Sequence, residues 1–483
     1  MVYSAEEKGL DIGFLCHGWK PDVGGVETHT FELATALQDR GHRVHVLCLD
    51  YTEGREPYSV QDTRVAGINV RRMSYLYHDQ RSLADMVDNW RARDVLFAWL
   101  AERPLDVLHV HHVTGFGTGA LKAVEEVGLP FVMTLHDYWS LCPRGQMLRT
   151  DGVVCATPEA EACGACLFQT WPHLLPGGEG DYRKPERGMV KDDAEAATAR
   201  TAYALRCLET PHRLFTPSKA AKAVYVQAGV PAERIEICTN GIATDEIVSY
   251  VRRLRSEGVR PIGSRGEVRL GVLGSVLPSK GVLELARAFQ KAAVPGLTLE
   301  VHGNLPAYHG DASYVQTLHA LSQEDTRIRL HGAYAIDALP QILAGLDGVA
   351  APSRWVEVFG LTVREASAAG LPVLVSDAGD LPAVTDKGRR GLVIPADDED
   401  AWVEALKRFG SDANLRRQWG DGPPVLRSTE DMMRQLERAY VEVIREVTKL
   451  EPLLVHPIEG SPQSEPESES SGGGFLRRLL GRD

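Results

Sequence analysis

The feature that most limits how this chain folds is a buried strand, a glycine-containing loop and an amphipathic helix, which occur in that order twice. The first copy begins with an apolar strand predicted at 11–16, and the second begins with a similar strand at 268–274. After each start, short apolar segments alternate with segments of helical periodicity, which is typical of parallel sheets with crossover helices. The sequence therefore predicts an α/β fold with two doubly wound domains. Further strands are predicted at 43–48, 107–111, 131–136, 213–216, 297–302, 328–330, 348–351 and 372–376.

The second start also sets the domain boundaries. We expect a first domain over 1–245, with a Gly-, Pro- and Cys-rich insertion at about 140–188, and a second domain over 246–425. A helix predicted over 426–450 follows and is expected to cross back to the first domain. Residues 451–483 have the Ser-, Pro-, Glu- and Gly-rich composition of a disordered acidic tail. A length of 483 residues fits two domains with such additions.

Charge and hydropathy disfavour several classes of protein. The formal net charge of −13 argues against nucleic-acid binding, which requires a basic surface. No apolar run approaches the roughly 20 residues that span a bilayer, and the amino terminus lacks the basic-then-apolar order of a signal peptide. We therefore expect a cytoplasmic protein whose cysteines are reduced or bound to metal.

Two glutamates, Glu357 and Glu365, flank the most informative segment of the chain. Glu357 lies in a loop that leaves a strand, and a helix is predicted to begin near Gly360 between the two carboxylates. The free N–H groups of a helix N-terminus favour a phosphate through hydrogen bonds and the helix dipole. This arrangement suits a ligand with hydroxyl groups at both ends of a diphosphate, which is the layout of a nucleotide sugar. The spacing alone favours the simpler interpretation of two surface glutamates near the start of a helix.

A glycine pair, Gly24-Gly25, lies in the loop after the first strand. Glycine has no Cβ, so a ligand can approach the backbone closely there, although the pair also fits a simple tight turn. The dinucleotide fingerprint Gly-x-Gly-x-x-Gly is absent from this loop, which disfavours a hydride-transferring dehydrogenase.

Several short motifs together resemble those of the family 4 glycosyltransferases, retaining enzymes with the GT-B fold of two Rossmann-like domains that face each other across a cleft. The resemblance extends from about Asp11 to Lys449. Each motif is common by itself, and their order and spacing carry the resemblance. The motifs are Gly24-Gly25-Val26-Glu27-Thr28-His29, Thr134-Leu135-His136-Asp137, Phe215-Thr216-Pro217-Ser218, Asn240-Gly241-Ile242, Gly274 to Gly281, the segment from Glu357 to Glu365, and Ala368 to Val373.

The resemblance implies a role for each matching residue. Glu357 would contact the hydroxyls of the donor sugar, and Glu365 would bind the ribose hydroxyls. Lys280 would neutralise the diphosphate. His136 would lie near the donor sugar and orient it or assist charge development at the anomeric carbon. Three consecutive backbone N–H groups would line the sugar and phosphate site, those of Phe359, Gly360 and Leu361.

Three more histidines, His109, His111 and His112, are expected to pack at a strand end or to line the cleft. Their H-x-H-H spacing could suggest a metal site, but strand alternation sends neighbouring side chains to opposite faces, which disfavours that interpretation.

Two positions depart from the family pattern. Ser275 stands where the family commonly has an arginine beside the donor phosphate, so one cation is missing unless another residue supplies it. Asp380 lies where the family usually has the second glycine of Gly-Gly-x-Pro-Glu. A carboxylate there would repel a phosphate or accept a hydrogen bond from a sugar hydroxyl. Both departures concern the geometry of the donor site and leave the expected fold unchanged.

The insertion contains four cysteines, and the last two have the C-x2-C spacing of a zinc knuckle. Four thiolates could complete a tetrahedral structural zinc site near His136. Reduced thiols in a mobile loop are the alternative. These cysteines are Cys142, Cys155, Cys163 and Cys166, whereas Cys16, Cys48, Cys207 and Cys238 are expected to be small core residues.

The end of the chain, residues 475–483, places apolar side chains at helical spacing among arginines. A short basic amphipathic segment of this kind could contact the inner face of the cell membrane weakly, where lipid-linked acceptors reside. A solvated tail or a partner-binding motif fits the same residues.

The resemblance implies a retaining hexosyltransferase that moves a sugar from a UDP- or GDP-sugar to a glycan, lipid-linked or other hydroxyl acceptor in cell-surface polysaccharide or glycoconjugate synthesis. The first domain would bind the acceptor and the second the donor. Catalysis would rest on positioning and on electrostatic stabilisation of the leaving diphosphate, with no required cofactor. Two alternatives are another GT-B enzyme, such as a sugar-nucleotide epimerase or a phosphorylase, and a non-catalytic sugar-nucleotide-binding protein.

Overall fold

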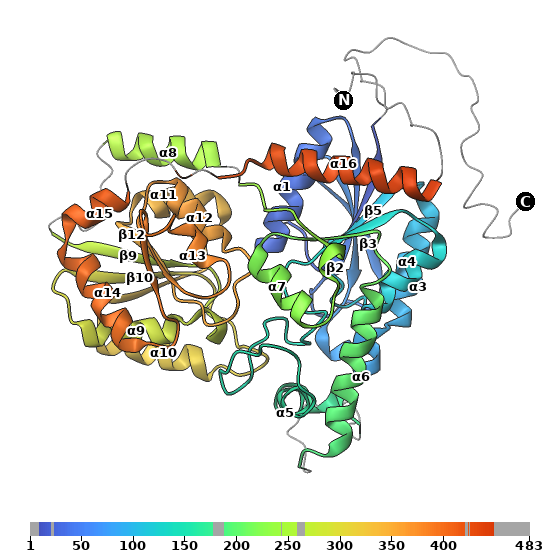
Figure 1. The fold of residues 1–483 in the computed structure, drawn as a ribbon, viewed down its shortest axis with the longest axis horizontal. Helices are drawn as coiled ribbons and strands as arrows, with labels where there is room; N and C mark the ends of the chain where they lie inside the picture. Colours follow the sequence, from blue (N-terminus) through green and yellow to red (C-terminus); the bar gives the residue numbers. More distant parts are fainter. Residues whose placement is uncertain are drawn as a thin grey trace, which may run out of the picture.

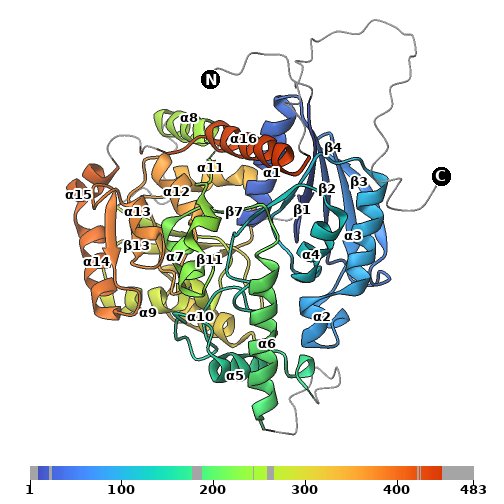
Figure 2. The same cartoon turned by 45° about the vertical axis from the view of Figure 1, so that its right-hand side comes forward.

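The computed structural model describes residues 9–448 except 21–23, 177–187, 243, 258–265, 421–423 and 425. Within these residues the chain forms two α/β units, each built on one largely parallel sheet with helices packed against it (Figures 1 and 2). The acidic tail and the amphipathic segment predicted at 475–483 lie outside the described residues.

The first sheet has the strand order β3-β4-β2-β1-β5-β6-β7-β8. Neighbouring strands are parallel except β3 and β4, which form an antiparallel hairpin at one edge. The prediction of a purely parallel sheet was therefore wrong at this edge. Sequence analysis missed β3 and β4, where polar and charged residues interrupt the apolar pattern, and the very short β8. The strands are β1 (Asp11–Leu15), β2 (Arg43–Asp50), β3 (Val60–Val65), β4 (Ile68–Ser74), β5 (Val107–Val110), β6 (Phe131–Thr134), β7 (Arg213–Thr216) and β8 (Ile235–Ile237).

Two apolar clusters cover this sheet, one on each face. Helices α1 and α16 share one cluster with the side chains of Ile12 and Phe14 from β1. The other cluster contains residues from α2, α3, α4, α6 and α7. The helices are α1 (Gly25–Asp39), α2 (Leu83–Val87), α3 (Trp90–Glu102), α4 (Gly119–Val127), α5 (Ala160–Thr170), α6 (Lys191–Cys207), α7 (Lys219–Gln227) and α16 (Thr429–Thr448).

The carboxy-terminal helix α16 follows the second unit in sequence but packs on the first (Figure 1). Its Tyr440 hydroxyl lies 2.6 Å from Nδ1 of His109, a fully buried residue of β5. The Nε2 atom of the same ring lies 2.7 Å from Oγ1 of Thr134 on β6. A buried polar chain therefore connects α16 to two central strands.

The second sheet has six parallel strands in the order β11-β10-β9-β12-β13-β14. The order reverses between β9 and β12, and in open α/β sheets ligands bind beyond the carboxyl ends of the strands at such a point. Sequence analysis missed the edge strand β14. The strands are β9 (Val268–Leu273), β10 (Leu297–His302), β11 (Ile328–Gly332), β12 (Gly348–Ala351), β13 (Val373–Ser376) and β14 (Gly391–Ile394).

Helices pack on both faces of the second sheet, where they form separate apolar clusters. Helix α8, which precedes β9, packs against α11 and α12 and thus joins the second unit. The helices are α8 (Thr244–Ser256), α9 (Val282–Ala292), α10 (Ser313–Glu324), α11 (Leu339–Ala344), α12 (Leu361–Ala368), α13 (Leu381–Val384), α14 (Glu399–Ser411) and α15 (Ala413–Trp419).

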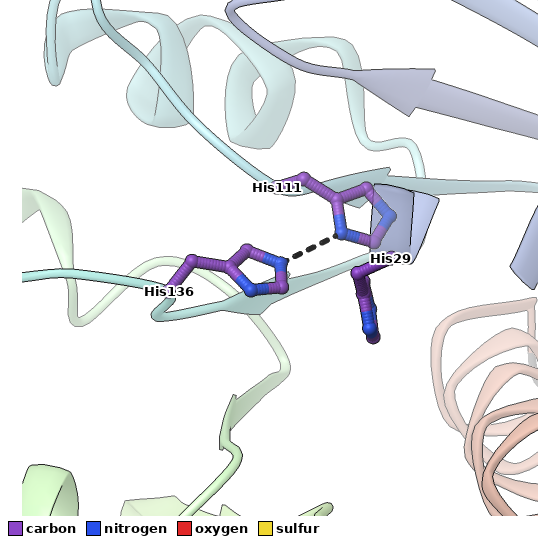
Figure 3. A group of neighbouring side chains, drawn as sticks. All are labelled: His29, His111 and His136. Atoms are coloured by element: carbon purple, nitrogen blue, oxygen red, sulfur yellow. Dashed lines mark hydrogen bonds between the residues drawn. The ribbon is translucent and has the colours of Figure 1, made fainter. Parts of the chain in front are cut away.

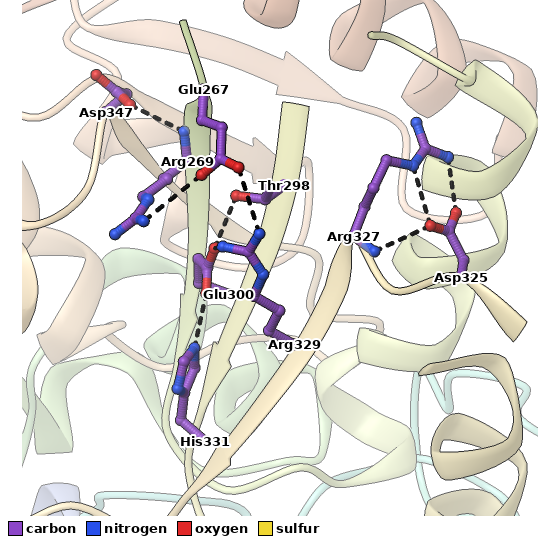
Figure 4. A network of polar contacts seen from close by, with 9 residues as sticks. All are labelled: Glu267, Arg269, Thr298, Glu300, Asp325, Arg327, Arg329, His331 and Asp347. Atoms are coloured by element: carbon purple, nitrogen blue, oxygen red, sulfur yellow. Dashed lines mark hydrogen bonds and ion pairs between the residues drawn. The ribbon is translucent and has the colours of Figure 1, made fainter. Parts of the chain in front are cut away.

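A charged network crosses one edge of this sheet (Figure 4). Glu300, buried in β10, accepts hydrogen bonds from Thr298, Arg329 and His331 at 2.7, 3.0 and 2.7 Å. Burial by itself would raise the pKa of Glu300, but these donors lower it below the ordinary value. The charges on edge strand β11 also disfavour pairing of this edge with another chain.

The insertion of the first unit reaches the second unit. Tyr308 Oη lies 2.8 Å from Gln146 Oε1, and Arg354 donates to the carbonyl oxygen of Gly152 at 3.3 Å. The Tyr138 hydroxyl, near the end of β6, donates to the carbonyl oxygen of Val356 at 2.9 Å. The loop that carries Glu357 is therefore held against the first unit.

Candidate functional site

A pocket of about 440 Å³ opens where the strand order of the second sheet reverses. The ends of β9 and β12 and the start of α12 form its walls. Sequence analysis singled out four of the residues that line it, Ser275, Lys280, Glu357 and Gly360. The structure thus brings residues from three separate segments into the position where this fold binds ligands.

One oxygen of Glu357 receives three hydrogen bonds in this pocket. Its Oε2 atom accepts from Lys280 Nζ at 2.7 Å, from Ser353 Oγ at 2.9 Å and from Trp355 Nε1 at 2.9 Å. Glu357 is buried, and Oε1 takes part in none of these bonds. The arrangement fixes the carboxylate and leaves Oε1 to accept from a ligand hydroxyl.

Glycines shape the backbone around this carboxylate. Gly360 precedes α12 with a φ of 73°, in the left-handed region that favours glycine. A Cβ at Gly379 would lie 2.1 Å from the carbonyl oxygen of Glu357, so only glycine allows these two loops to pack. The next residue, Asp380, donates its backbone N–H to that carbonyl at 2.9 Å.

The second glutamate, Glu365, lies at the junction of the two units and does not line the pocket described above. It is 4% exposed, and its Oε2 atom has no hydrogen-bond partner among the described residues. Burial, together with the nearby charge of Glu32 on α1, raises the pKa of Glu365 to about 7. Burial also raises the pKa of Glu32 to about 7.

The Phe359 backbone precedes α12, and its side chain is buried under a cation. The Arg364 guanidinium lies 4.0 Å from the centre of the Phe359 ring and pairs with Asp380 at 2.6 Å. The carboxylate of Asp380 is therefore neutralised within the protein.

Leu361 begins α12 and is partly exposed. Among the described side chains that line the pocket at the strand-order reversal, Lys280 is the one cation. No second cation in this lining therefore replaces the arginine that the family commonly has at the position of Ser275.

The carboxyl ends of β5 and β6 in the first unit bring together histidines (Figure 3). His111 Nδ1 lies 3.1 Å from His136 Nε2, and His29 of α1 lies with its ring centre 4.7 Å from that of His136. Burial lowers the pKa of His29 to about 4 and that of His111 and His136 well below the ordinary value. Sequence analysis did not assign a role to His29, although it closes the Gly24-to-His29 motif.

The other two histidines of the H-x-H-H segment have different partners. His109 bonds to Tyr440 and Thr134, as described above, and His112 Nε2 lies 3.1 Å from Asp137 Oδ2. The three histidines of the segment therefore do not share one set of partners. His111 alone faces His29 and His136.

The glycine pair stands at the start of α1. A Cβ at Gly24 would lie 2.3 Å from Oε2 of Glu27, whose carboxylate pairs with His17 at 3.0 Å. The space left by Gly24 is thus occupied by the protein itself. At Gly25, apart from its chain neighbours and the backbone of its own helix, no atom of the described residues lies within 4 Å of the corresponding position, so the backbone is open to close approach there.

The four cysteines of the insertion are partly buried near one another. Burial, together with the neighbouring thiols, raises the pKa of Cys155 to about 12 and that of Cys163 to about 11. Among the described residues, the three histidines are the one group whose ligand atoms all lie within 4.8 Å of each other. The cysteines do not form such a set, and their zinc site stays a prediction. The other four, Cys16, Cys48, Cys207 and Cys238, are buried, as the sequence predicted.

Comparison with solved structures defines the class of fold. The chain superposes on sucrose-phosphate synthase from Thermosynechococcus elongatus with a TM-score of 0.64 at 16% identity, covering 90% of this chain and 100% of that one. It superposes on HepE of Anabaena, solved with UDP and glucose, with a TM-score of 0.59 at 19% identity, covering 89% and 99%. Two parallel-sheet units in this arrangement are those of the GT-B glycosyltransferases.

Sequence comparison then identifies the family. The profile described as Glycosyltransferase Family 4 matches residues 23–246, and the profile described as Glycosyl transferases group 1 matches residues 267–412. The chain belongs to the family 4 glycosyltransferases, as its motifs predicted.

Characterised relatives carry names of the same kind. A D-inositol 3-phosphate glycosyltransferase of Stackebrandtia nassauensis is 26% identical over 408 residues, 83% of this chain and 82% of the relative. A GDP-mannose-dependent alpha-(1-6)-phosphatidylinositol monomannoside mannosyltransferase of Mycobacterium tuberculosis is 28% identical over 204 residues, 39% of this chain and 50% of the relative. Among the described residues, no helix combines the length and the apolar character needed to cross a membrane.

Proposed function

We propose that this glycosyltransferase moves a hexose from a UDP- or GDP-sugar to a hydroxyl of a glycan or lipid-linked acceptor, with retention of the anomeric configuration, in cell-surface glycan or glycoconjugate synthesis. The observation that carries the proposal is the Lys280–Glu357 pair at the strand-order reversal, beside the start of α12. A cation, an oriented carboxylate and free N–H groups are what a sugar diphosphate requires.

The electrostatics of this pocket fit a leaving diphosphate. Lys280 and the first N–H groups of α12 would stabilise the charge that develops on the phosphate as the glycosidic bond breaks. Oε1 of Glu357 would accept from the donor sugar, because Oε2 is already held by three donors. Glu365, whose Oε2 has no partner among the described residues, would accept from the ribose.

Retention is what the resemblance to the family 4 enzymes implies. The acceptor hydroxyl would attack from the face that the diphosphate leaves, and the diphosphate would help to remove its proton. His136 would orient the sugar from the side of the first unit. The acceptor class is supported by the names of the relatives, which act on inositol phosphate and on a phosphatidylinositol mannoside.

A thermal-shift panel of UDP-, GDP- and ADP-sugars tests the donor. A ligand present at 100 times its Kd stabilises the folded state by about 2.7 kcal/mol, so the true donor will raise Tm clearly above the others. Glu357→Gln should lose most of this shift, whereas Glu284→Gln, outside the pocket lining, should retain it. If no nucleotide sugar raises Tm at millimolar concentration, the proposal is wrong.

Product analysis separates the transferase from its alternatives. NMR of the product made with the selected donor should show the anomer of the donor. An epimer of the free sugar nucleotide, formed without acceptor, would assign the chain to the epimerases. Dependence on free phosphate would indicate a phosphorylase, and binding without donor hydrolysis or transfer would indicate a non-catalytic protein.

A further inference from the structure

Three histidines from three different segments converge beyond the carboxyl end of the first sheet, and none of them lines the pocket of the second unit. His29 comes from the second turn of α1, His111 follows β5 and His136 follows β6 (Figure 3). Each offers a ring nitrogen, and these three atoms all lie within 4.8 Å of one another. The strand order of the first sheet reverses between β1 and β5, so the group occupies the position where this kind of sheet accepts a ligand.

The hydrogen bonding of these rings is incomplete among the described residues. Both ring nitrogens of His29 and the Nε2 atom of His111 are buried without a partner. His29 is 5% exposed and His111 is 1% exposed, so bulk water reaches neither ring freely. By contrast, the adjacent His109 has both of its nitrogens bonded, to Tyr440 and Thr134. Buried polar atoms of native proteins normally have a hydrogen-bond partner. Because these ring nitrogens have none among the described residues, they point to a ligand that binds here.

The imidazole nitrogens of these three residues indicate which kind of ligand would bind. An imidazole binds metal through a neutral ring, and burial keeps these three rings neutral at physiological pH. Two nitrogens on one tetrahedral Zn²⁺, each at 2.0–2.1 Å, are about 3.3 Å apart. His111 Nδ1 and His136 Nε2 already lie 3.1 Å apart. Imidazole ligands suit zinc and other first-row divalent ions and do not suit Mg²⁺ or Ca²⁺.

We propose that His29, His111 and His136 form a binding site for a first-row divalent metal ion, with Zn²⁺ as the leading candidate. Three histidines leave a fourth tetrahedral position for water or a ligand oxygen. The bound ion ties the second turn of α1 to the ends of β5 and β6. This inference goes beyond the proposed function but shares His136 with it, because the same residue is proposed to orient the donor sugar. Zn²⁺ affinity and Tm, measured without donor or acceptor, test the metal site separately.

Zn²⁺ titration by calorimetry, on metal-free full-length protein, tests the site. Because the insertion cysteines also bind metal in our sequence prediction, the titration uses the Cys163→Ser/Cys166→Ser background. We expect one equivalent of Zn²⁺ to bind and to raise Tm. His29→Phe preserves a ring in the packing but removes both nitrogens, and it should weaken binding at least 10-fold and remove the Tm increase. His319→Gln, a change to a histidine on α10 of the second unit, is the matched control and should bind like the parent.

The spectrum of the Co²⁺-loaded protein gives a second readout, since nitrogen ligands produce tetrahedral visible bands without thiolate charge transfer. If His29→Phe fails to show a cooperative melting curve, His29→Gln replaces it in the same titration. The proposal is overturned if the parent binds no Zn²⁺ or Co²⁺. It is equally overturned if a folded His29 variant binds Zn²⁺ as tightly as His319→Gln does.

Discussion

Arg364 and Asp380, 16 positions apart in the sequence, form an ion pair with an Nη2–Oδ2 distance of 2.6 Å beside the loop of Glu357. Arg364 is 7% exposed and also stacks over Phe359. The aspartate that departs from the family pattern therefore has a partner, and its negative charge is balanced before any phosphate binds.

Replacing Asp380 with asparagine should destabilise the protein by about 3 kcal/mol, because it leaves a buried guanidinium without its counter-ion. Urea denaturation measures the loss. The double variant Arg364→Leu/Asp380→Gly removes both charges and should recover most of the stability. The single variants Arg364→Leu and Asp380→Gly complete the cycle, and if their losses add up to that of the double variant, the two residues are not coupled.

Lys280→Ala should reduce kcat/KM about 10- to 100-fold, the range expected for losing a charge-assisted hydrogen bond of about 1.5–3 kcal/mol. The lysine would no longer neutralise the diphosphate, and Glu357 would lose its cation. Lys291→Ala provides the matched control, since Lys291 pairs with Asp400 at the surface and should leave kcat/KM unchanged. Equal activities of the two variants would remove Lys280 from the site.

Donor affinity should rise as the pH increases from about 6 to 8. The pKa of Glu365 is raised to about 7, so the group is mostly protonated below this pH and mostly charged above it. A carboxylate accepts hydrogen bonds from two ribose hydroxyls better than a carboxylic acid does. Calorimetric Kd values across this pH range measure the effect.

Two variants test the assignment of this pH dependence. Glu365→Gln should bind donor weakly and without the pH dependence, and Glu365→Ala should abolish binding and turnover. Glu32→Gln removes the charge that raises the pKa of Glu365, so the midpoint should move to lower pH. An unchanged pH profile in Glu365→Gln would assign the titration to another group.

The same raised pKa affects stability. Because the folded pKa of Glu365 exceeds its ordinary value of 4.5, the folded state binds more protons between pH 4.5 and 7. Its stability therefore falls as the pH rises through this window. In donor-free protein at pH 8, Glu365→Gln should be more stable than the parent by up to about 3 kcal/mol, since one pKa unit corresponds to 1.36 kcal/mol. A lower stability of this variant at pH 8 would contradict the raised pKa.

Tyr440→Phe should lower the free energy of unfolding by about 1 kcal/mol, because it removes the hydrogen bond between α16 and His109. Tyr250→Phe, at a partly exposed tyrosine of α8, is the control and should change stability little. An equal effect of the two substitutions would show that the contact contributes nothing specific.

Much of the fold could be predicted because buried parallel strands appear in the sequence as short apolar segments. Val107–Val110 and Phe131–Thr134 are fully buried runs in which three of four residues are apolar, and such runs can be recognised without knowledge of their neighbours. The strands that sequence analysis missed include β3, β8 and β14, which lie at sheet edges. An edge strand has one neighbour and more contact with solvent, which fits the polar sequence of β3. Strand β8 has only three residues, and β14 is apolar, so this reason does not apply to β14.

By itself the sequence determined the two α/β units, the family, and the residues Lys280, Glu357 and Gly360 that line the pocket of the second unit. These follow from short-range patterns, because periodicity and loop motifs act within one segment. Tertiary structure alone decided that Arg364 pairs with Asp380, that Glu365 faces Glu32, and that His29 meets His111 and His136. Such encounters depend on strand order and on helix packing, which bring together side chains whose separation along the chain carries no local signal.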